Sequence, residues 1–258
     1  MYREELKTIA GTAKKKNKMF KNTPLKYALS CILGGMYVAF GTMLSYSMGA
    51  GLEASGSTYS YKIAMGLSFG IALCLIVFAG ADLYTSNNMV MTIGASEKET
   101  TWADALKLWG FCWIGNLIGS VILAWMLVYG GLINDTSAEF IAHYVDMKTS
   151  ITVGQMIIRG ILCNMLVCLA SWCSYKVKNE AAKVLLIAWC VFAFFTAGFE
   201  HSIANMGLFS IGLMVPQGAG LAIGKVISSL FFVTIGNTIG GAIVVGLSYV
   251  FMTGKDNK

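Results

Sequence analysis

Two short stretches decide the fold: GADLYTSNNM at residues 80–89 and GFEHSIANM at residues 198–206. Each stretch has a glycine, a carboxylate two residues later and a closing Asn-Met pair. The carboxylates are Asp82 and Glu200, and both stretches lie within strongly apolar sequence. Such polar interruptions are tolerated at membrane depth only where protein or a water-filled cavity surrounds them.

A second match follows each stretch: residues 115–120 read GNLIGS and residues 236–241 read GNTIGG. The two matches occur in the same order, at offsets of 118 and 121 residues, which predicts an internal repeat with one small insertion. A repeat of three spans must insert its second copy upside down relative to the first. The sequence therefore predicts a 3+3 inverted repeat whose two polar stretches meet near the bilayer midplane.

The composition indicates a polytopic membrane protein. Of the 258 residues, 56% are hydrophobic and only 12% are charged, and the mean hydropathy is +0.67; about a quarter of the residues are charged in an ordinary soluble domain. Glycine is frequent (29 residues) and proline is rare (2 residues), as in tightly packed membrane helices. These values exclude a soluble enzyme, a nucleic-acid-binding domain and a disordered chain.

Intervals that are almost free of charge mark six hydrophobic segments, since a transmembrane helix needs about 20 mostly apolar residues. The segments are residues 27–52, 63–81, 108–134, 149–175 (interrupted by Arg159), 184–199 and the stretch after Lys225. At about 1.5 Å per residue the fifth segment is too short to cross, and the second runs into Asp82 and further polar residues. We therefore expect an all-α membrane protein of six helices with an aquaporin-like architecture, in which the second and fifth helices break inside the membrane. The alternative is a fifth helix that is merely short and tilted.

We expect one membrane channel domain over residues 1–258. It comprises a basic amphipathic segment (1–22), a first three-helix repeat (23–130) and a second three-helix repeat (131–258). With the N-terminus inside, 15 of the 19 Lys and Arg residues fall on one side, including Lys255 and Lys258. The positive-inside rule then places both termini in the cytoplasm of a multi-pass cell-membrane protein. No signal peptide is expected, because the first 25 residues are basic and polar.

The N-terminal segment has a weak helical stripe of Tyr2, Leu6, Ile9 and Ala13 beside three consecutive lysines at 14–16. One interpretation is an interfacial helix that lies on anionic lipid. The other is a mobile lid or an anion-attracting mouth. The sequence leaves both open.

The run FEHSIANM at 199–206, together with GADLYT at 80–85, resembles the signature pair of the formate/nitrite transporter family. Residues 159–164, RGILCN, resemble that family's fourth helix, and the overall pattern is most similar to its hydrosulfide-channel branch. The resemblance extends over essentially all of the chain after about residue 20. It implies a homopentamer with one anion pore per protomer and a central axis plugged by lipid.

His201 is the central candidate. A histidine beside a carboxylate inside a membrane is costly and is by default a functional residue, and its ordinary pKa near neutrality lets small changes in environment alter its protonation. The alternative is a histidine that only satisfies loop carbonyls. The second histidine, His143, is expected in a polar, solvated outer loop. By resemblance, the first break closes on the pore and Thr85 faces His201.

The two carboxylates are expected to stabilise the breaks. Asp82 and Glu200 can accept hydrogen bonds from backbone amides that a helix break leaves free; a direct proton relay is the alternative. Asn88 and Asn205, like the asparagines of the second match, are expected to connect the breaks to neighbouring helices.

The resemblance also implies apolar constrictions and a polar approach. The constrictions fall at Leu73, Leu83 and Phe194, with Phe69 a weaker candidate. Composition alone would assign such residues to packing. Lys148 and Asn164 match positions that flank a central chamber, and Lys148 is expected to give an anion a positive outer approach. Arg159, expected on the same helix as Lys148, is expected to pair or snorkel.

These parts suggest a channel for small monovalent anions: hydrosulfide, formate, nitrite or chloride. A bare charge in an apolar constriction is costly, so the anion would take a proton from His201 or relayed water and cross as the neutral acid. Hydrosulfide suits this scheme because its conjugate acid loses a proton near neutrality. The main alternative is a proton-coupled secondary transporter of formate or nitrite that uses the same site. A non-transporting anchor or enzyme subunit is disfavoured by the intramembrane His201, and an aquaporin-type pore by the missing Asn-Pro-Ala signatures.

The remaining motifs indicate no cofactor, no metal and no enzymatic activity. All seven cysteines lie in apolar segments without a C-x-x-C motif, so we interpret them as small buried residues. With two histidines there is no zinc or haem ligand set, and no phosphate-binding loop or nucleophile elbow is present. Residues 101–104 and 152–155 predict capping boxes at the start of two helices.

Overall fold

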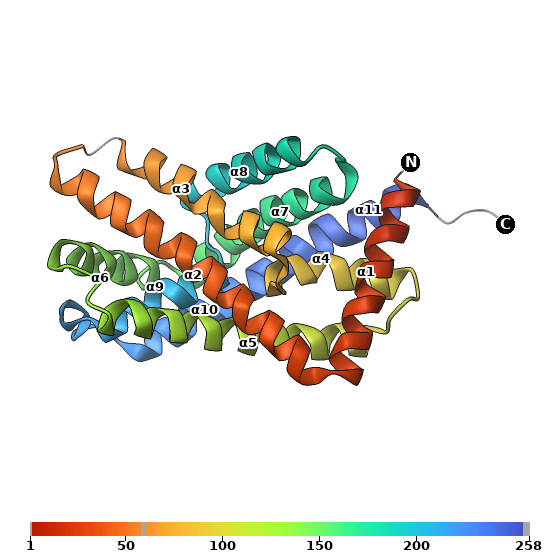
Figure 1. The fold of residues 1–258 in the computed structure, drawn as a ribbon, viewed down its shortest axis with the longest axis horizontal. Helices are drawn as coiled ribbons and strands as arrows, with labels where there is room; N and C mark the ends of the chain where they lie inside the picture. The colour runs from red at the N-terminus through yellow and green to blue at the C-terminus, as the bar shows by residue number, and fades with distance from the viewer. Residues whose placement is uncertain (1, 58–59, 255–258) are drawn as a thin grey trace.

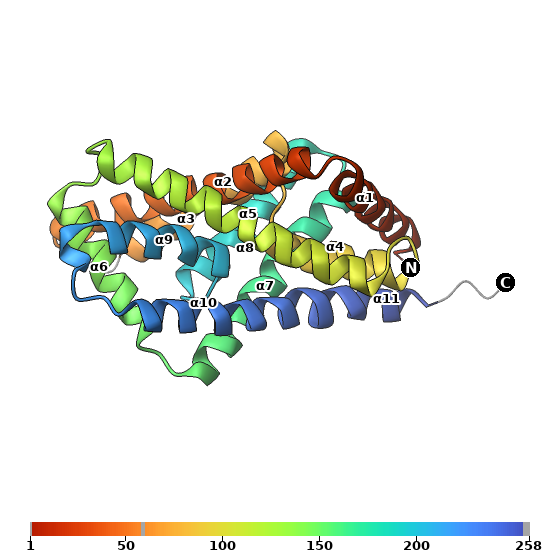
Figure 2. The ribbon, with the colours of Figure 1, turned by 90° about the horizontal axis from the view of Figure 1, so that it is seen from below.

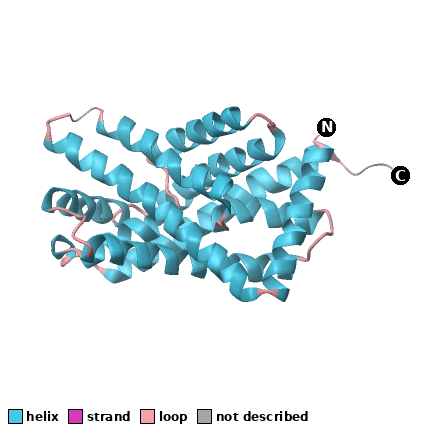
Figure 3. Cartoon of the chain, in the orientation of Figure 1, coloured by secondary structure: helices cyan, strands magenta, loops and turns pink. Residues whose placement is uncertain are grey.

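The computed structural model describes residues 2–57 and 60–254, and all regular secondary structure in those ranges is helical (Figures 1 and 3). Lys255 and Lys258, which enter the orientation argument, lie outside the described residues. In chain order the elements are α1 Arg3–Asn22, α2 Pro24–Ala54, α3 Tyr61–Leu75, the π-helical η1 Ile76–Gly80, α4 Tyr84–Ser96, α5 Trp102–Tyr129, α6 Asp135–Thr149, α7 Val153–Lys176, α8 Glu180–Thr196, α9 Ser202–Met214, the short 3₁₀ turn η2 Pro216–Gly218, α10 Ile223–Thr238, the π-helical η3 Ile239–Leu247 and α11 Ser248–Thr253.

The prediction of an all-α membrane protein is confirmed. Five helical stretches of the described chain are long and apolar enough to span a bilayer: Pro24–Ala54, Tyr61–Gly80, Trp102–Tyr129, Val153–Lys176 and Ile223–Thr253. The stretch predicted as the fifth segment forms α8, which has only 17 residues, and the 13-residue apolar helix α9 follows it. Large apolar side chains such as those of Leu106, Trp125 and Phe231 are more than half exposed, as expected for a surface in contact with lipid.

The helical path stops and restarts at both polar stretches. The π-helical η1 ends at Gly80, which has a φ of +81°; the chain then continues through extended backbone and begins α4 at Tyr84. After α8 it passes Gly198, with a φ of +73°, and begins α9 at Ser202. Only glycine adopts this left-handed conformation without strain, which explains the shared glycine.

Two pairs of helices approach closely through glycine. A Cβ atom at Gly35 would overlap the carbonyl oxygen of Asn116, so α2 and α5 touch backbone to backbone. In the second half, a Cβ atom at Gly236 would overlap the carbonyl oxygen of Ile157, which brings α10 against α7. Glycine is required at these two positions, since small residues let membrane helices approach closely.

Residues 135–149 form a helix, and the prediction of an outer loop there is wrong. The Asn134 side chain accepts a hydrogen bond from the Ser137 amide at 2.9 Å and begins α6. His143 lies on the exposed face of this helix and Lys148 in its last turn. The predicted capping box at Thr152 then begins α7, so Arg159 is not on the same helix as Lys148. The predicted capping box at Thr101 is also present.

The apolar stripe of α1 is covered by protein rather than by lipid. Leu6, Ile9 and Ala13 are fully buried, and a Cβ atom at Gly94 of α4 would overlap the Ala13 methyl group. Figure 2 shows α1 across one end of the bundle, beside α4 and α11. The structure therefore places this helix as a cover on the end of α4.

Candidate functional site

Thr85 and His201 meet at the centre of the molecule, between the starts of α4 and α9. Thr85 Oγ1 lies 3.0 Å from His201 Nε2, and both residues are buried. His201 is the N-cap of α9, and its Nδ1 accepts a hydrogen bond from the Ala204 amide at 3.0 Å. Because Nδ1 is an acceptor, we assign the proton of the neutral imidazole to Nε2, which then donates to Thr85. His201 thus satisfies a free helix amide, and not the loop carbonyls of the alternative interpretation.

Apolar side chains lie around His201. A cavity of about 10 Å³ borders His201, which is about the room that one water molecule needs. All four predicted constriction residues line this cavity: Leu73, Leu83, Phe194 and Phe69. The Phe194 ring is nearly parallel to the imidazole, with ring centroids 6.0 Å apart. The structure thus brings these residues together around one narrow point.

A larger cavity of about 530 Å³ leads from His201 to the α6 end of the molecule. We call it the vestibule. Its lining is mixed, with aromatic side chains such as those of Tyr46 and Tyr144 beside the charged residues Lys148, Arg159 and Glu200. His143, which the sequence assigned to a solvated loop, also lines it.

Glu200 is held by side chains. Lys148 Nζ lies 2.9 Å from both carboxylate oxygens, and Asn205 Nδ2 donates to Oε2 at 2.7 Å. The Glu200 side chain is 2% exposed and the Lys148 side chain 17%. The expectation that Lys148 offers an anion free positive charge is therefore wrong, because Glu200 neutralises it.

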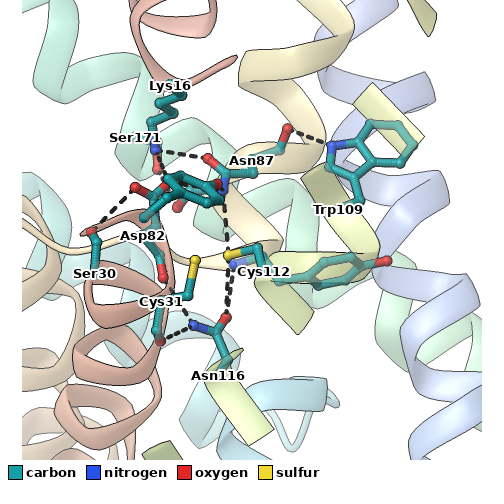
Figure 4. A network of polar contacts seen from close by, with 12 residues as sticks. Lys16, Ser30, Cys31, Asp82, Asn87, Trp109, Cys112, Asn116 and Ser171 are labelled. Atoms are coloured by element: carbon teal, nitrogen blue, oxygen red, sulfur yellow. Dashed lines mark hydrogen bonds and ion pairs between the residues drawn. The ribbon is translucent and has the colours of Figure 1, made fainter. Parts of the chain in front are cut away.

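Asp82 has an equivalent network in the first half (Figure 4). It accepts from Lys16 Nζ of α1 at 2.5 Å, from Asn87 Nδ2 at 3.0 Å and from the Tyr27 hydroxyl at 3.2 Å. Burial disfavours the Lys16 ammonium, but the charge of Asp82 outweighs this and holds the pKa of Lys16 above its ordinary value. The sequence did not single out either Lys16 or Asn87.

Asparagine side chains, rather than the carboxylates, accept hydrogen bonds from the backbone amides that are left free where α4 and α9 begin. Asn116 Oδ1 accepts from the Tyr84 amide at 2.9 Å, and Asn116 Nδ2 donates to the carbonyl oxygens of Asp82 at 2.9 Å and Cys31 at 2.7 Å. The prediction that carboxylates accept stranded amides is wrong for both stretches. The amide side chain suits this position better because it can donate and accept at once.

Asn237 makes the same contacts in the second half. Its Oδ1 accepts from the Ser202 amide at 2.8 Å, and its Nδ2 donates to the carbonyl oxygens of Glu200 at 2.9 Å and Gly160 at 2.8 Å. The prediction that the asparagines of the second match connect the polar stretches to neighbouring helices is confirmed.

Asn88 is not the counterpart of Asn205. Asn205 bonds the carboxylate five residues before it, and Asn87 has the same spacing to Asp82. Asn88 instead accepts from Asn164 Nδ2 of α7 at 3.1 Å, a contact with a neighbouring helix. Matching the two stretches by their Asn-Met pairs sets Asn88 against Asn205, which is one residue too far along the first stretch. Matching them by the five-residue spacing from carboxylate to asparagine sets Asn87 against Asn205.

Asn164 connects the two halves. Its Nδ2 lies 3.1 Å from the Thr85 carbonyl oxygen and 2.7 Å from the Asn237 carbonyl oxygen. It is fully buried and does not line either cavity. Its contacts position Thr85.

The last feature of the site concerns metal ligands. Within residues 2–57 and 60–254, no group of three or more His, Cys, Asp or Glu side chains could hold a metal ion.

Comparison with known proteins agrees with this geometry. Residues 3–251 match the family described as formate/nitrite transporter. The chain is 35% identical to the nitrite transporter NirC of Escherichia coli K12, over 100% of this chain and 95% of the relative. It is 30% identical to the formate channel FocA of the same strain, over 91% and 88% of the two chains.

Two solved structures have the same fold. One, described as an FNT family ion channel, aligns with a TM-score of 0.92 and 33% identity over 97% of this chain and 99% of that chain. The other, described as a pentameric formate channel with formate bound, aligns with a TM-score of 0.80 and 27% identity over 91% and 99%. The chain therefore belongs to the formate/nitrite transporter family and is a multi-pass membrane transport protein, not an enzyme.

Proposed function

We propose that the protein is a channel for small monovalent anions, which pass from the vestibule through the Thr85–His201 site. The observation that carries this proposal is the position of the pair. A 3.0 Å hydrogen bond between two buried side chains joins the starts of α4 and α9. His201 borders both the vestibule and the narrow apolar cavity. His201, held by the buried Thr85, lies where the vestibule meets the apolar constriction, which suits it to pass a small solute from one to the other.

The apolar constriction favours passage as the neutral acid. A bare anion between Leu73, Leu83 and Phe194 would lose its hydration without compensation, which is costly. His201 is poorly placed to supply the proton, because a second proton would have to occupy Nδ1, which already accepts the Ala204 amide. We therefore propose that the proton comes from hydronium in the vestibule, and that Thr85, which accepts a hydrogen bond from His201 Nε2, donates its hydroxyl hydrogen to the solute.

The proposed substrates are nitrite and formate, with hydrosulfide and chloride in the same class. The relatives described above are named for nitrite and formate. Hydrosulfide stays in the proposal because its conjugate acid loses a proton near neutrality. Chloride is the useful contrast, since hydrogen chloride is too strong an acid to form in water, and it should pass slowly.

We further propose the architecture that this mechanism needs. The matching contacts of Asn116 and Asn237, and of Lys16 and Lys148, support an inverted repeat with both helix interruptions near the bilayer midplane. One solved relative is described as pentameric, which supports a homopentamer with one pore per protomer and a lipid-plugged axis. The bias of basic residues supports cytoplasmic termini.

Purified protein in liposomes tests the function. We expect formate, nitrite and hydrosulfide to cross faster than in empty vesicles, increasingly so as the pH is lowered, and chloride to lag. His201→Phe should abolish this pH-dependent flux. Unchanged flux in that variant at every pH would refute the role of His201. Uphill accumulation driven by a pH gradient would instead establish the alternative, a proton-coupled transporter, since a channel cannot produce it.

A further inference from the structure

Arg159 lines the vestibule at the depth of the central site. It is the seventh residue of α7, about 9 Å along the helix axis from Val153. Its carbonyl oxygen accepts the Glu200 amide at 3.2 Å, so the residue lies beside the second polar stretch. The residue is half-buried and borders the same cavity as His201.

In the part of the chain that the structure describes, the Arg159 guanidinium has no counter-ion, so it does not form the pair suggested by the sequence. Within residues 2–57 and 60–254, no ion pair or side-chain hydrogen bond involves it. Lys148, the other cation at this depth, binds both oxygens of Glu200. The remaining vestibule charges, Glu53 and Lys62, are on exposed residues. Positive charge at the inner end of the vestibule therefore comes from Arg159.

We propose that Arg159 forms an anion-binding site in the vestibule, where the substrate is held before it reaches Thr85 and His201. This inference rests on the proposed function and adds a specificity to it. A guanidinium presents two parallel N–H donors that match the two oxygens of a carboxylate or a similar planar anion. The site should thus favour formate and nitrite over chloride and hydrosulfide, which cannot bind in this two-point manner.

The surroundings favour such a site. A cavity lined by low-dielectric walls concentrates the field of a charge and raises the local concentration of counter-ions. Because a water-accessible cavity of about 530 Å³ adjoins the guanidinium, a small hydrated anion can reach it. An isolated cation at membrane depth is costly, and a bound substrate anion would offset that cost.

The effect of the Arg159 side chain can be tested without disturbing the backbone hydrogen bond that this residue makes. Glu200 bonds the Arg159 carbonyl oxygen, which any substitution retains. The test is initial formate and chloride influx into liposomes over a range of concentrations, for wild type, Arg159→Gln and Arg159→Lys. Lys225→Gln is the matched control, because it removes the same charge from an exposed residue that borders neither cavity.

We expect Arg159→Gln to raise the half-saturating formate concentration about tenfold and to leave the maximal rate within about twofold. Arg159→Lys should keep chloride uptake at the wild-type level, because the positive charge remains. Its formate uptake should lie between those of Arg159→Gln and wild type, because an ammonium lacks the two-point geometry. Added inert salt should raise the wild-type half-saturating concentration more than that of Arg159→Gln.

Three outcomes would overturn the inference. These are an unchanged half-saturating concentration, a loss confined to the maximal rate, or equal losses for formate and chloride in Arg159→Lys. If Arg159→Gln does not fold, the formate-to-chloride ratio of Arg159→Lys decides alone. Absence of wild-type flux would instead refute the proposed function itself.

Discussion

Lys148 Nζ lies 2.9 Å from each carboxylate oxygen of Glu200, so the most prominent cation of the vestibule is already paired within the protein. The pair joins the last turn of α6 to the loop that begins α9. Its counterpart, Lys16 with Asp82, joins α1 to the loop that begins α4. In each half a helix outside the bundle core thus supplies a lysine to the carboxylate of the polar stretch.

Removing one member of the Lys148–Glu200 pair should destabilise the protein. Glu200→Gln leaves a largely buried ammonium without its counter-charge, and we expect a loss of about 3 kcal/mol in the free energy of unfolding. Thermal unfolding in detergent measures it. The double variant Lys148→Met/Glu200→Gln should recover much of the loss, and a wild-type melting temperature for Glu200→Gln alone would contradict the prediction.

Thr85→Val should impair flux while leaving the shape of the site intact. Valine nearly matches threonine in volume but leaves the Nε2 proton of His201 without an acceptor, which costs about 1–3 kcal/mol. We expect formate influx into liposomes to fall at least about tenfold. Thr85→Ser retains the hydroxyl and should keep most of the activity; equal rates for the valine and serine variants would argue against a role for the hydroxyl.

Lys16 should be the lysine that holds α1 in place. Asp82 is 6% exposed, so Lys16→Met leaves a buried unpaired carboxylate and should cost about 3 kcal/mol. The neighbouring Lys15 is exposed, and Lys15→Met should change stability by no more than about 0.5 kcal/mol. Chemical unfolding in detergent, with proteolysis of α1 as a second readout, distinguishes the two; equal losses would place the contact elsewhere.

The pH dependence of the Lys16 contact follows from the direction of its pKa shift. Because the pKa of Lys16 in the folded protein lies above its ordinary value of 10.5, its contribution is complete below that value and is lost only as the pH rises through the raised pKa. The stability difference between wild type and Lys16→Met should therefore be flat on the alkaline side of neutrality. A decline beginning well below 10.5 would contradict this assignment.

Gly236→Ala should be strongly destabilising, because its Cβ atom would overlap the Ile157 carbonyl oxygen and force α10 away from α7. Overpacking of this kind typically costs about 1–3 kcal/mol. Gly110 is a matched control within the described helices, since nothing lies within 4 Å of a Cβ atom placed there. Gly110→Ala should be neutral or stabilise by up to about 1 kcal/mol. Comparable melting temperatures for the two variants would contradict the close α7–α10 contact.

Much of the fold could be predicted because it depends on local quantities. Hydropathy sums over about 20 residues identify spans, and side chains three residues apart predict helix starts, as at Thr101 and Thr152. α6 escaped detection because it is amphipathic and neither long nor apolar enough for a span. Its local signals were the cap residue Asn134, the acidic Asp135 in its first turn and the basic Lys148 in its last turn.

The candidate site was predictable only in part. The polar stretches identified Asp82, Glu200 and His201 within apolar sequence. The sequence could not show which side chain bonds which backbone amide. A carboxylate and an asparagine can both accept a hydrogen bond from a free helix amide, and only helix packing decides which of them lies within reach of that amide. Asn88 bonds Asn164 of the neighbouring helix α7, as predicted, whereas the prediction is wrong for Asn205, which bonds Glu200 of its own stretch.

The sequence by itself determined a helical membrane protein with two interrupted polar stretches, because scarcity of charge and glycine spacing act locally along the chain. Only the tertiary structure decided which charged side chains form ion pairs within the protein and which do not. Lys16 is one of three consecutive lysines, and Lys148 and Arg159 are both cations that line the vestibule with Glu200. Their roles differ because Asp82 and Glu200 lie within 2.9 Å of the two lysines, while no acidic side chain in the described chain pairs with Arg159. Those partners are separated by 66 and 52 residues, so helix packing, and not local sequence, sets the electrostatics of the site.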